Sequence, residues 1–175
     1  GHPRNVPDDV LDRLRAAKDG IVMATFVPDF ISDEVRDWMH PLREAFKRNT
    51  GGGWLAAIEA WEQTHGPRPR ATLEQVADHI QYLAQKIGPE RLGIGSDYFG
   101  VPTKPVGLMD VSRLPYLLAE LIRRGWSDEA IAGIASQNFV RVWRAVEREG
   151  EQLRRTRAAA IGTVEDYDLT PAAAE

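Results

Sequence analysis

Two short apolar segments constrain the fold of this chain more than any other feature of its sequence. They are Ile21–Val27 (IVMATFV) and Arg91–Ser96 (RLGIGS). The first has no polar alternation, and in the second Gly93 and Gly95 allow close approach of a neighbouring backbone, so both are predicted to be buried strands. A parallel sheet of two strands cannot cover both of its faces and stand alone. We therefore expect further strands to complete the sheet.

Helical patterns surround these two strands. Between them, Ser32–Thr64 has helical spacing, and the break at Asn49–Gly53 predicts a hairpin of two helices. Thr72 and Gln75 have the spacing of a capping box, which opens the next helix. The remaining predicted helices cover Pro7–Lys18, Val111–Arg124, Asp128–Ala135 and Asn138–Gln152.

The alternation of strands and helices predicts an α/β fold with a parallel sheet. We expect the C-terminal part of a (β/α)8 TIM-type barrel with an inserted helical hairpin, its missing strands lying upstream. Residues 1–152 are assigned to this part of the barrel, residues 33–64 to the insertion and residues 153–175 to a C-terminal tail.

Charge and composition exclude several classes of function. The chain has 22 Lys and Arg against 26 Asp and Glu, a net charge of −4. Nucleic acids and anionic membranes attract clustered positive charge, so neither is expected as a partner. The absence of cysteine excludes disulfides, thiolate metal sites and thiol nucleophiles. No apolar run approaches the roughly 20 residues of a membrane span, and no signal peptide is visible. We expect a soluble globular protein.

Candidate site residues follow from the predicted barrel, because catalytic groups in such barrels lie at the carboxyl ends of the strands. Asp97 follows the second strand and either points into the barrel mouth or caps nearby backbone N–H groups. Arg4 is either a carboxylate-binding guanidinium or an ordinary surface arginine. Phe30, after the first strand, either lines a pocket or packs in the interior.

The four histidines show no metal-binding pattern. His2, His40, His65 and His79 belong to no HxH, HxD or HExxH motif, so no metal ligand is predicted within this chain. His79 follows Asp78 on a predicted helix, and a structural histidine with a partner is the favoured interpretation. His2 lies near Arg4 and could approach a pocket.

Several motifs together resemble one known family. The segment Arg4–Asp9 (RNVPDD) resembles a motif of the membrane (renal) dipeptidase family, peptidase family M19. Further segments are similar to that family in consistent order: Val22–Phe26 with Ile31-Ser32, Ala71–Ile80 (ATLEQVADHI), Gly93–Tyr98 (GIGSDY), Leu121–Trp126 (LIRRGW) and Asn138–Trp143 (NFVRVW). The resemblance covers roughly residues 2 to 148.

The resemblance implies a (β/α)8 barrel that holds two zinc ions and hydrolyses dipeptides, including some with a D-residue at the carboxyl end. It places Arg4 on the arginine that binds the substrate carboxylate. It places Asp97 on an active-site aspartate that contacts the substrate amine or the metal-bridging water. Phe30 falls where many members carry a pocket tyrosine, and Phe99 replaces an acid that the family usually has.

The family's zinc ligands all precede the Arg4–Asp9 motif and are absent from this sequence. We therefore expect a zinc dipeptidase of which this chain carries the substrate-positioning half and is inactive alone. The alternative is a metal-free binding or structural module derived from the same fold. Expected partners are a dipeptide, the N-terminal part of the barrel and, in a homodimer, a second copy of the chain. The compartment, bacterial cytoplasm or periplasm, stays open.

Overall fold

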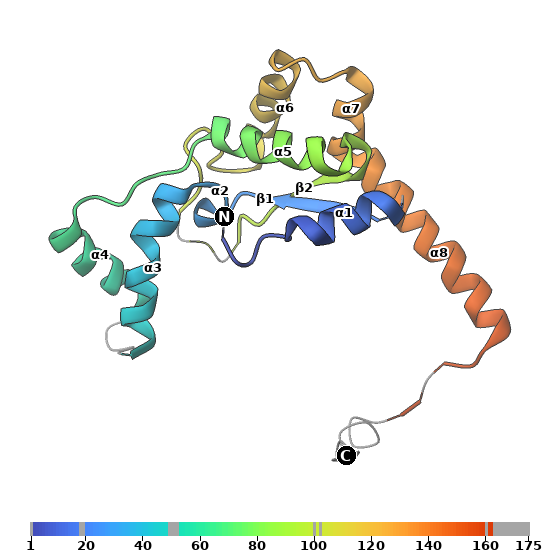
Figure 1. Cartoon of the computed structure of the whole chain (residues 1–175), viewed down its shortest axis with the longest axis horizontal. Helices are drawn as coiled ribbons and strands as arrows, with labels where there is room; N and C mark the ends of the chain where they lie inside the picture. Colours follow the sequence, from blue (N-terminus) through green and yellow to red (C-terminus); the bar gives the residue numbers. More distant parts are fainter. Residues whose placement is uncertain are drawn as a thin grey trace. The chain divides into compact units, whose positions relative to one another are not determined.

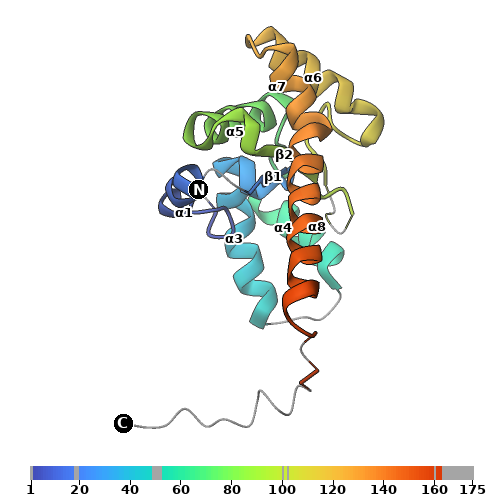
Figure 2. The ribbon, with the colours of Figure 1, turned by 90° about the vertical axis from the view of Figure 1, so that its right-hand side faces the viewer.

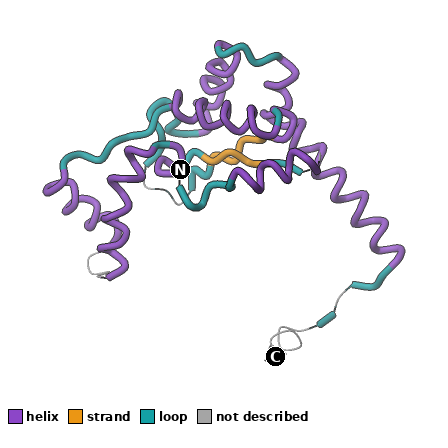
Figure 3. The backbone as a smooth tube through the Cα atoms, in the orientation of Figure 1, coloured by secondary structure: helices purple, strands orange, loops and turns teal. Residues whose placement is uncertain are grey.

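The computed structural model describes residues 2–17, 20–48, 53–99, 101, 103–159 and 161–162. It divides into two units, residues 1–142 and residues 143–175. The first unit is a helix-rich α/β fold built around two strands (Figure 1). Figure 3 shows how small a part of the chain these strands are.

Both predicted strands are present and pair in parallel. They are β1 (Val22–Thr25) and β2 (Leu92–Ser96), with Val22 opposite Leu92 and an irregularity in register after Ala24. The expectation of close approach at the glycines is confirmed, since a Cβ on Gly93 would lie 2.5 Å from the Met23 sulfur. Larger residues there would push the strands apart.

The helices cover one face of this sheet. Helix α1 (Asp8–Ala17) precedes β1 and helix α5 (Leu73–Ile87) connects the strands; Figure 2 shows both on the same side of the strands. Ala24 is buried against this layer, whereas Met23 points away and is 37% exposed. Since Met23 stays exposed, the prediction of a first strand buried on both faces is not met in the part of the chain that the structure describes.

The main core lies between the strands and the helices. Its buried members come from β1, β2, α1, α5 and the C-terminal helices: Leu11, Ala24, Phe26, Leu73, Val76, Ala77, Ile80, Leu83, Ile87, Leu92, Leu108, Leu117, Leu121 and Ile134. The predicted capping box at the start of α5 is confirmed. The Gln75 N–H donates to Thr72 Oγ1 (3.3 Å) and the Thr72 N–H donates to Gln75 Oε1 (3.0 Å).

Between β1 and α5 the chain forms the predicted hairpin of two helices. A one-turn helix, α2 (Pro28–Ile31), leads into α3 (Asp33–Arg48) and α4 (Gly53–His65). The predicted break lies largely outside the described residues. A small second core joins the hairpin to the segment before α5: Val35, Met39, Leu42, Ile58 and Ala71. Where a loop was expected after β1, Pro28 and Asp29 instead begin α2, because proline and an acid both suit a first helical turn.

The helices after β2 close the first unit. A 3₁₀ turn, η1 (Pro89–Arg91), precedes β2, and a second, η2 (Val111–Arg113), leads into α6 (Leu114–Arg123). Helix α7 (Asp128–Ala132) continues through a π-helical segment, η3 (Gly133–Gln137), into α8 (Asn138–Thr156). The predicted interruption before Asn138 is therefore a π-segment rather than a break.

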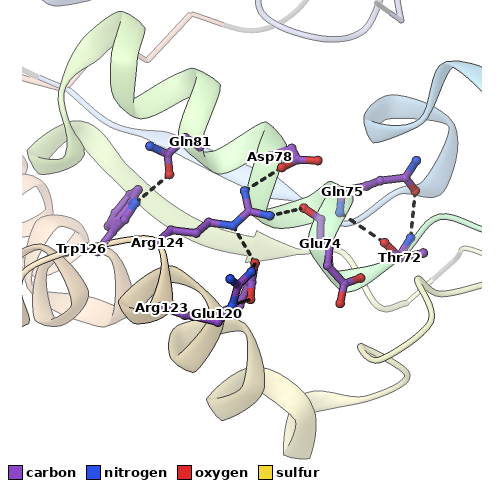
Figure 4. Close-up of polar contacts among 9 residues, drawn as sticks. All are labelled: Thr72, Glu74, Gln75, Asp78, Gln81, Glu120, Arg123, Arg124 and Trp126. Atoms are coloured by element: carbon purple, nitrogen blue, oxygen red, sulfur yellow. Dashed lines mark hydrogen bonds and ion pairs between the residues drawn. The ribbon is translucent and has the colours of Figure 1, made fainter.

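Polar contacts attach α6 to α5. The Arg124 guanidinium donates to Asp78 Oδ1 (2.6 Å), to the Glu74 carbonyl oxygen (3.1 Å) and to Glu120 Oε1 (2.7 Å), as Figure 4 shows. Nearby, Trp126 Nε1 donates to Gln81 Oε1 (3.1 Å). These contacts hold the C-terminal end of α6 against α5.

The second unit begins inside α8. The helix extends to Thr156, four residues beyond the predicted end at Gln152, with Arg154 and Arg155 in its last turn. Cations there interact favourably with the helix dipole. Residues 160 and 163–175, which make up much of the predicted tail, lie outside the described residues.

Candidate active site

The three site residues predicted from the sequence line one cavity of about 890 Å³. Arg4 lies in the turn before α1, Phe30 in α2 after β1, and Asp97 directly after β2. Phe30 and Asp97 therefore follow the carboxyl ends of the two paired strands, where α/β folds place their ligands. The structure brings Arg4 and Asp97, which are 93 positions apart in the sequence, onto the same cavity.

Phe30 contacts the segment of residues 2–5, which carries Arg4. The Arg4 guanidinium carbon lies 4.9 Å from the ring centroid, and the His2 ring stacks on Phe30 with centroids 4.3 Å apart. Asn5 Nδ2 donates to the Phe30 carbonyl oxygen at 2.8 Å. A guanidinium over an aromatic face can still donate to an anion, because its N–H groups point outward in its own plane. Phe30 can thus orient Arg4 without a hydroxyl group.

A buried carboxylate lies behind this stack. Asp29 is only 6% exposed, and Arg43 of α3 donates to its Oδ2 at 2.7 Å. His2 Nε2 lies 3.7 Å from the same oxygen. Burial lowers the pKa of His2, an effect that Asp29 partly offsets and that Arg43, Arg4 and Arg36 reinforce. His2 is therefore neutral at neutral pH, consistent with its Nδ1 accepting from the Arg4 N–H at 3.1 Å.

Sequence reasoning missed Asp29 and Arg43. Asp29 follows β1 directly, so its place at a strand end was a signal for a site residue. Arg43 gave no such signal, because it lies 14 residues further on within a charged helix.

The backbone at Asp97 has an uncommon conformation. Ser96 has φ 37° and Asp97 has φ 62°, both in the left-handed region that few residues other than glycine adopt. The Asp97 N–H donates to the Gly95 carbonyl oxygen at 2.5 Å. This turn ends β2 and leaves the carboxylate exposed on the cavity. Residues in such uncommon backbone conformations are often found at functional sites.

His79 also lines the cavity, from α5. Burial lowers its pKa. Asp78, the neighbour of His79 in sequence, forms an ion pair with Arg124 at the end of α6. Adjacent residues on a helix point in different directions, so neighbours in sequence are poor partners.

Several His and Asp side chains on the cavity are of the types that bind metal ions. His2, Asp8, Asp33, Asp78, His79 and Asp97 all line it. Yet among the residues that the structure describes, no three His, Cys, Asp or Glu side chains come together as a ligand set. Structural and catalytic zinc sites in proteins use at least three such ligands. The described residues do not fit a zinc site by themselves.

Comparison with known proteins identifies the family. The sequence profile of membrane dipeptidase (peptidase family M19) matches residues 1–157. The chain belongs to the membrane dipeptidase family. The resemblance read from the sequence motifs is thereby confirmed. Members of this family are dipeptidases and metallopeptidases.

Curated relatives in the membrane dipeptidase family include three fungal proteins. Dipeptidase verJ of Clonostachys rogersoniana is 37% identical over 89% of this chain. An uncharacterized dipeptidase of Schizosaccharomyces pombe and dipeptidase tcpJ of Claviceps purpurea are each 36% identical, over 87% and 83% of the chain. The aligned part is 31%, 29% and 26% of these relatives, so the chain spans less than a third of their length.

Solved structures share the fold. The probable dipeptidase PvdM from Pseudomonas aeruginosa superposes with a TM-score of 0.63 at 26% identity, covering 83% of this chain and 41% of PvdM. A metallopeptidase from Rhodobacter sphaeroides, bound to a phosphinate mimic of the dipeptide L-Ala-D-Ala, superposes with a TM-score of 0.55 at 23% identity. It covers 79% of this chain and 30% of that protein. No helix in the described part of this chain is both long and apolar enough to cross a membrane.

Proposed function

We propose that this chain is the substrate-positioning part of a zinc-dependent dipeptidase that accepts dipeptides with an L- or a D-residue at the carboxyl end. The observation that carries the proposal is the placement of Arg4 and Asp97 on one cavity at the carboxyl edge of the sheet. A dipeptide bears one carboxylate and one ammonium group. A guanidinium and a carboxylate on the same cavity match these two charges.

Each of the three residues has a proposed role. Arg4 binds the substrate carboxylate through paired N–H groups, which fixes both position and orientation. Asp97 receives the ammonium group or orients the attacking water, from its position directly after β2. Phe30 packs against Arg4 and sets the plane of its guanidinium.

The rest of the active unit is proposed to lie outside the described residues. An exposed Met23 and a sheet of two parallel strands are consistent with one sector of a (β/α)8 barrel. Among the described residues, no ligand set is found for the two zinc ions expected from the family. The roles proposed for this chain therefore concern the substrate alone.

Hydrolysis of L-Ala-D-Ala and L-Ala-L-Ala by the zinc-loaded full-length protein tests this function. Arg4→Met is expected to lower kcat/KM by about tenfold or more, since a hydrogen bond to a charged group contributes about 1.5–3 kcal/mol. Arg13→Met, on an exposed arginine of α1, is the matched control and is expected to match the wild type.

Titration calorimetry separates the alternatives. If the zinc-loaded protein binds dipeptides with heat release but hydrolyses none, the chain belongs to a binding module and the peptidase proposal fails. If Arg4→Met hydrolyses both dipeptides like the wild type, the role proposed for Arg4 is wrong.

A further inference from the structure

Residues 2–5 form a tight turn that carries Arg4, and His2 closes this turn with two hydrogen bonds. The Asn5 N–H donates to the His2 carbonyl oxygen at 3.0 Å, and the Arg4 N–H donates to His2 Nδ1 at 3.1 Å. The second bond requires Nδ1 to be an acceptor, so the proton of the neutral ring lies on Nε2. His2 thus fixes the position of the Arg4 backbone.

The His2 ring is itself held in place by its surroundings. It stacks on Phe30 with ring centroids 4.3 Å apart and an angle of 27° between the ring planes, and the His2 side chain is only 13% exposed. The Arg4 guanidinium carbon lies 4.9 Å from the centroid of the same Phe30 ring. Two stacked rings therefore position Arg4: His2 contacts its backbone and Phe30 contacts its side chain.

Charged groups surround the His2 ring. Asp29 Oδ2, on α2, lies 3.7 Å from His2 Nε2, but this carboxylate already accepts from Arg43 of α3 at 2.7 Å. Burial lowers the pKa of His2 most strongly, Asp29 raises it, and Arg43, Arg4 and Arg36 lower it further. The ring is therefore the neutral acceptor that the Arg4 N–H requires at neutral pH.

A proton on His2 Nδ1 is incompatible with the turn as it stands. An imidazolium carries a proton on both nitrogens, so Nδ1 and the Arg4 N–H would meet as two donors. The new positive charge would also lie beside the Arg4 guanidinium. Asp29 offers little compensation, because Arg43 already balances its charge. In acid the Arg4 backbone therefore loses one of its two hydrogen bonds to residue 2.

We propose that His2 is a positioning residue for the carboxylate-binding Arg4, and that protonation of His2 in acid releases Arg4 and weakens substrate binding. This inference rests on the proposed dipeptidase function. Histidine suits the role because it changes charge closer to neutrality than other side chains do. His2 acts through Arg4, which holds the substrate and not the reacting bond, so the effect belongs in KM rather than in kcat.

Two substitutions separate the hydrogen bond of His2 from its titration. His2→Asn places a carbonyl oxygen near the position of Nδ1, so it keeps an acceptor for the Arg4 N–H that acid does not protonate. His2→Ala has no side-chain acceptor at all. His40→Asn, on an exposed histidine of α3, is the matched control.

The measurement is KM and kcat for L-Ala-D-Ala with the zinc-loaded full-length protein. From pH ~8 to pH ~5, the KM of the wild type and of His40→Asn is expected to rise about threefold or more beyond that of His2→Asn. At the higher pH, His2→Ala is expected to have a KM about fivefold above the wild type, as for one lost hydrogen bond, with kcat within about twofold. The comparison with His2→Asn removes the titration of all other groups from the result.

An NMR titration of the histidine rings gives a readout besides activity. His2→Asn assigns the His2 signals, and the pH at which His2 gains its proton should coincide with the rise in KM. A His2 ring already protonated at the higher pH overturns the proposal.

The kinetic outcomes separate this inference from the function on which it rests. An equal rise in KM in the wild type and His2→Asn, or a folded His2→Ala with the wild-type KM, overturns the role of His2 while the dipeptidase function stands. A loss confined to kcat in His2→Ala does the same. If His2→Ala does not fold, the comparison of the wild type with His2→Asn decides alone. Failure of the wild type to hydrolyse L-Ala-D-Ala at the higher pH overturns the proposed function and this inference with it.

Discussion

Arg43 on α3 and Asp29 on α2 join the α3–α4 hairpin to the strand end that carries the candidate site. The guanidinium donates to Asp29 Oδ2 at 2.7 Å, and the next residue, Phe30, supports Arg4. The hairpin is therefore not an independent appendage: a charge on one of its helices neutralises a carboxylate beneath the site. This contact makes the hairpin part of the framework that positions Arg4.

Replacing Arg43 is expected to destabilise the fold. Arg43→Met leaves the Asp29 carboxylate buried without its partner, and breaking a buried pair in this way costs about 3–5 kcal/mol. Since Arg43 itself is 41% exposed, we expect about 2 kcal/mol, measured as the change in the free energy of unfolding in urea. Lys47→Met, which breaks an exposed pair with Glu44 on the same helix, should cost less than about 0.5 kcal/mol. Equal losses in the two variants would contradict this.

The capping box of α5 gives a second prediction of stability. Thr72→Ala removes the hydroxyl that accepts from the Gln75 N–H, and losing an N-cap costs about 1 kcal/mol. Because α5 packs on the main core, the loss should appear as a lower midpoint of global thermal unfolding. Ser136→Ala, at an exposed position of η3, serves as the control and should leave the midpoint unchanged. An unaltered midpoint in Thr72→Ala would show that the cap contributes nothing to the fold.

The contacts of Glu120 predict how stability depends on pH. Hydrogen bonds from Arg123 and Arg124 lower the pKa of Glu120 from 4.5 to about 2. A carboxyl group with a depressed pKa in the folded state stabilises the fold fully above its unfolded pKa, and this contribution is lost as the pH falls through the folded pKa. Wild type should therefore lose more stability than Glu120→Gln between pH ~5 and pH ~2.

Urea unfolding of both proteins across this range measures the difference. Glu129→Gln, on an exposed carboxylate of α7, is the control and should follow the wild-type curve. Parallel curves for wild type and Glu120→Gln would mean that the pair does not stabilise the fold.

The sequence was sufficient to predict those parts of the fold that local signals determine. Both strands, the helical hairpin and the Thr72–Gln75 cap were visible because each depends on residues a few positions apart. Helix α2 was missed because a single turn is too short to show helical periodicity. The π-segment before Asn138 was missed for a different reason. The Asn138 side chain donates to the carbonyl oxygens of Pro89 and Leu92, both at 2.8 Å, and such a tertiary contact has no local signature.

The candidate site was predictable in part. The positions of Asp97 and Phe30 after strands, together with the motif around Arg4, identified three residues that the structure places on one cavity. Their roles stay predictions. The Asp29–Arg43 pair could not be predicted, because it depends on how the hairpin folds back onto the strand end.

A substitution at Asp97 can remove the negative charge of the side chain while keeping the backbone conformation. Asp97→Asn keeps a side chain that tolerates the left-handed conformation observed at φ 62°, so the fold should be retained. It removes the negative charge that is proposed to hold the ammonium group or orient the water. We expect kcat for L-Ala-D-Ala in the zinc-loaded full-length protein to fall by about 100-fold or more, within the range for a lost general acid–base group. The thermal midpoint should stay within about 2 °C of the wild type, since exposed substitutions usually change stability by less than 0.5 kcal/mol.

Asp97→Gly, which suits the backbone even better, is the companion variant and should lose as much activity. Turnover by Asp97→Asn at the wild-type rate would remove this carboxylate from the mechanism.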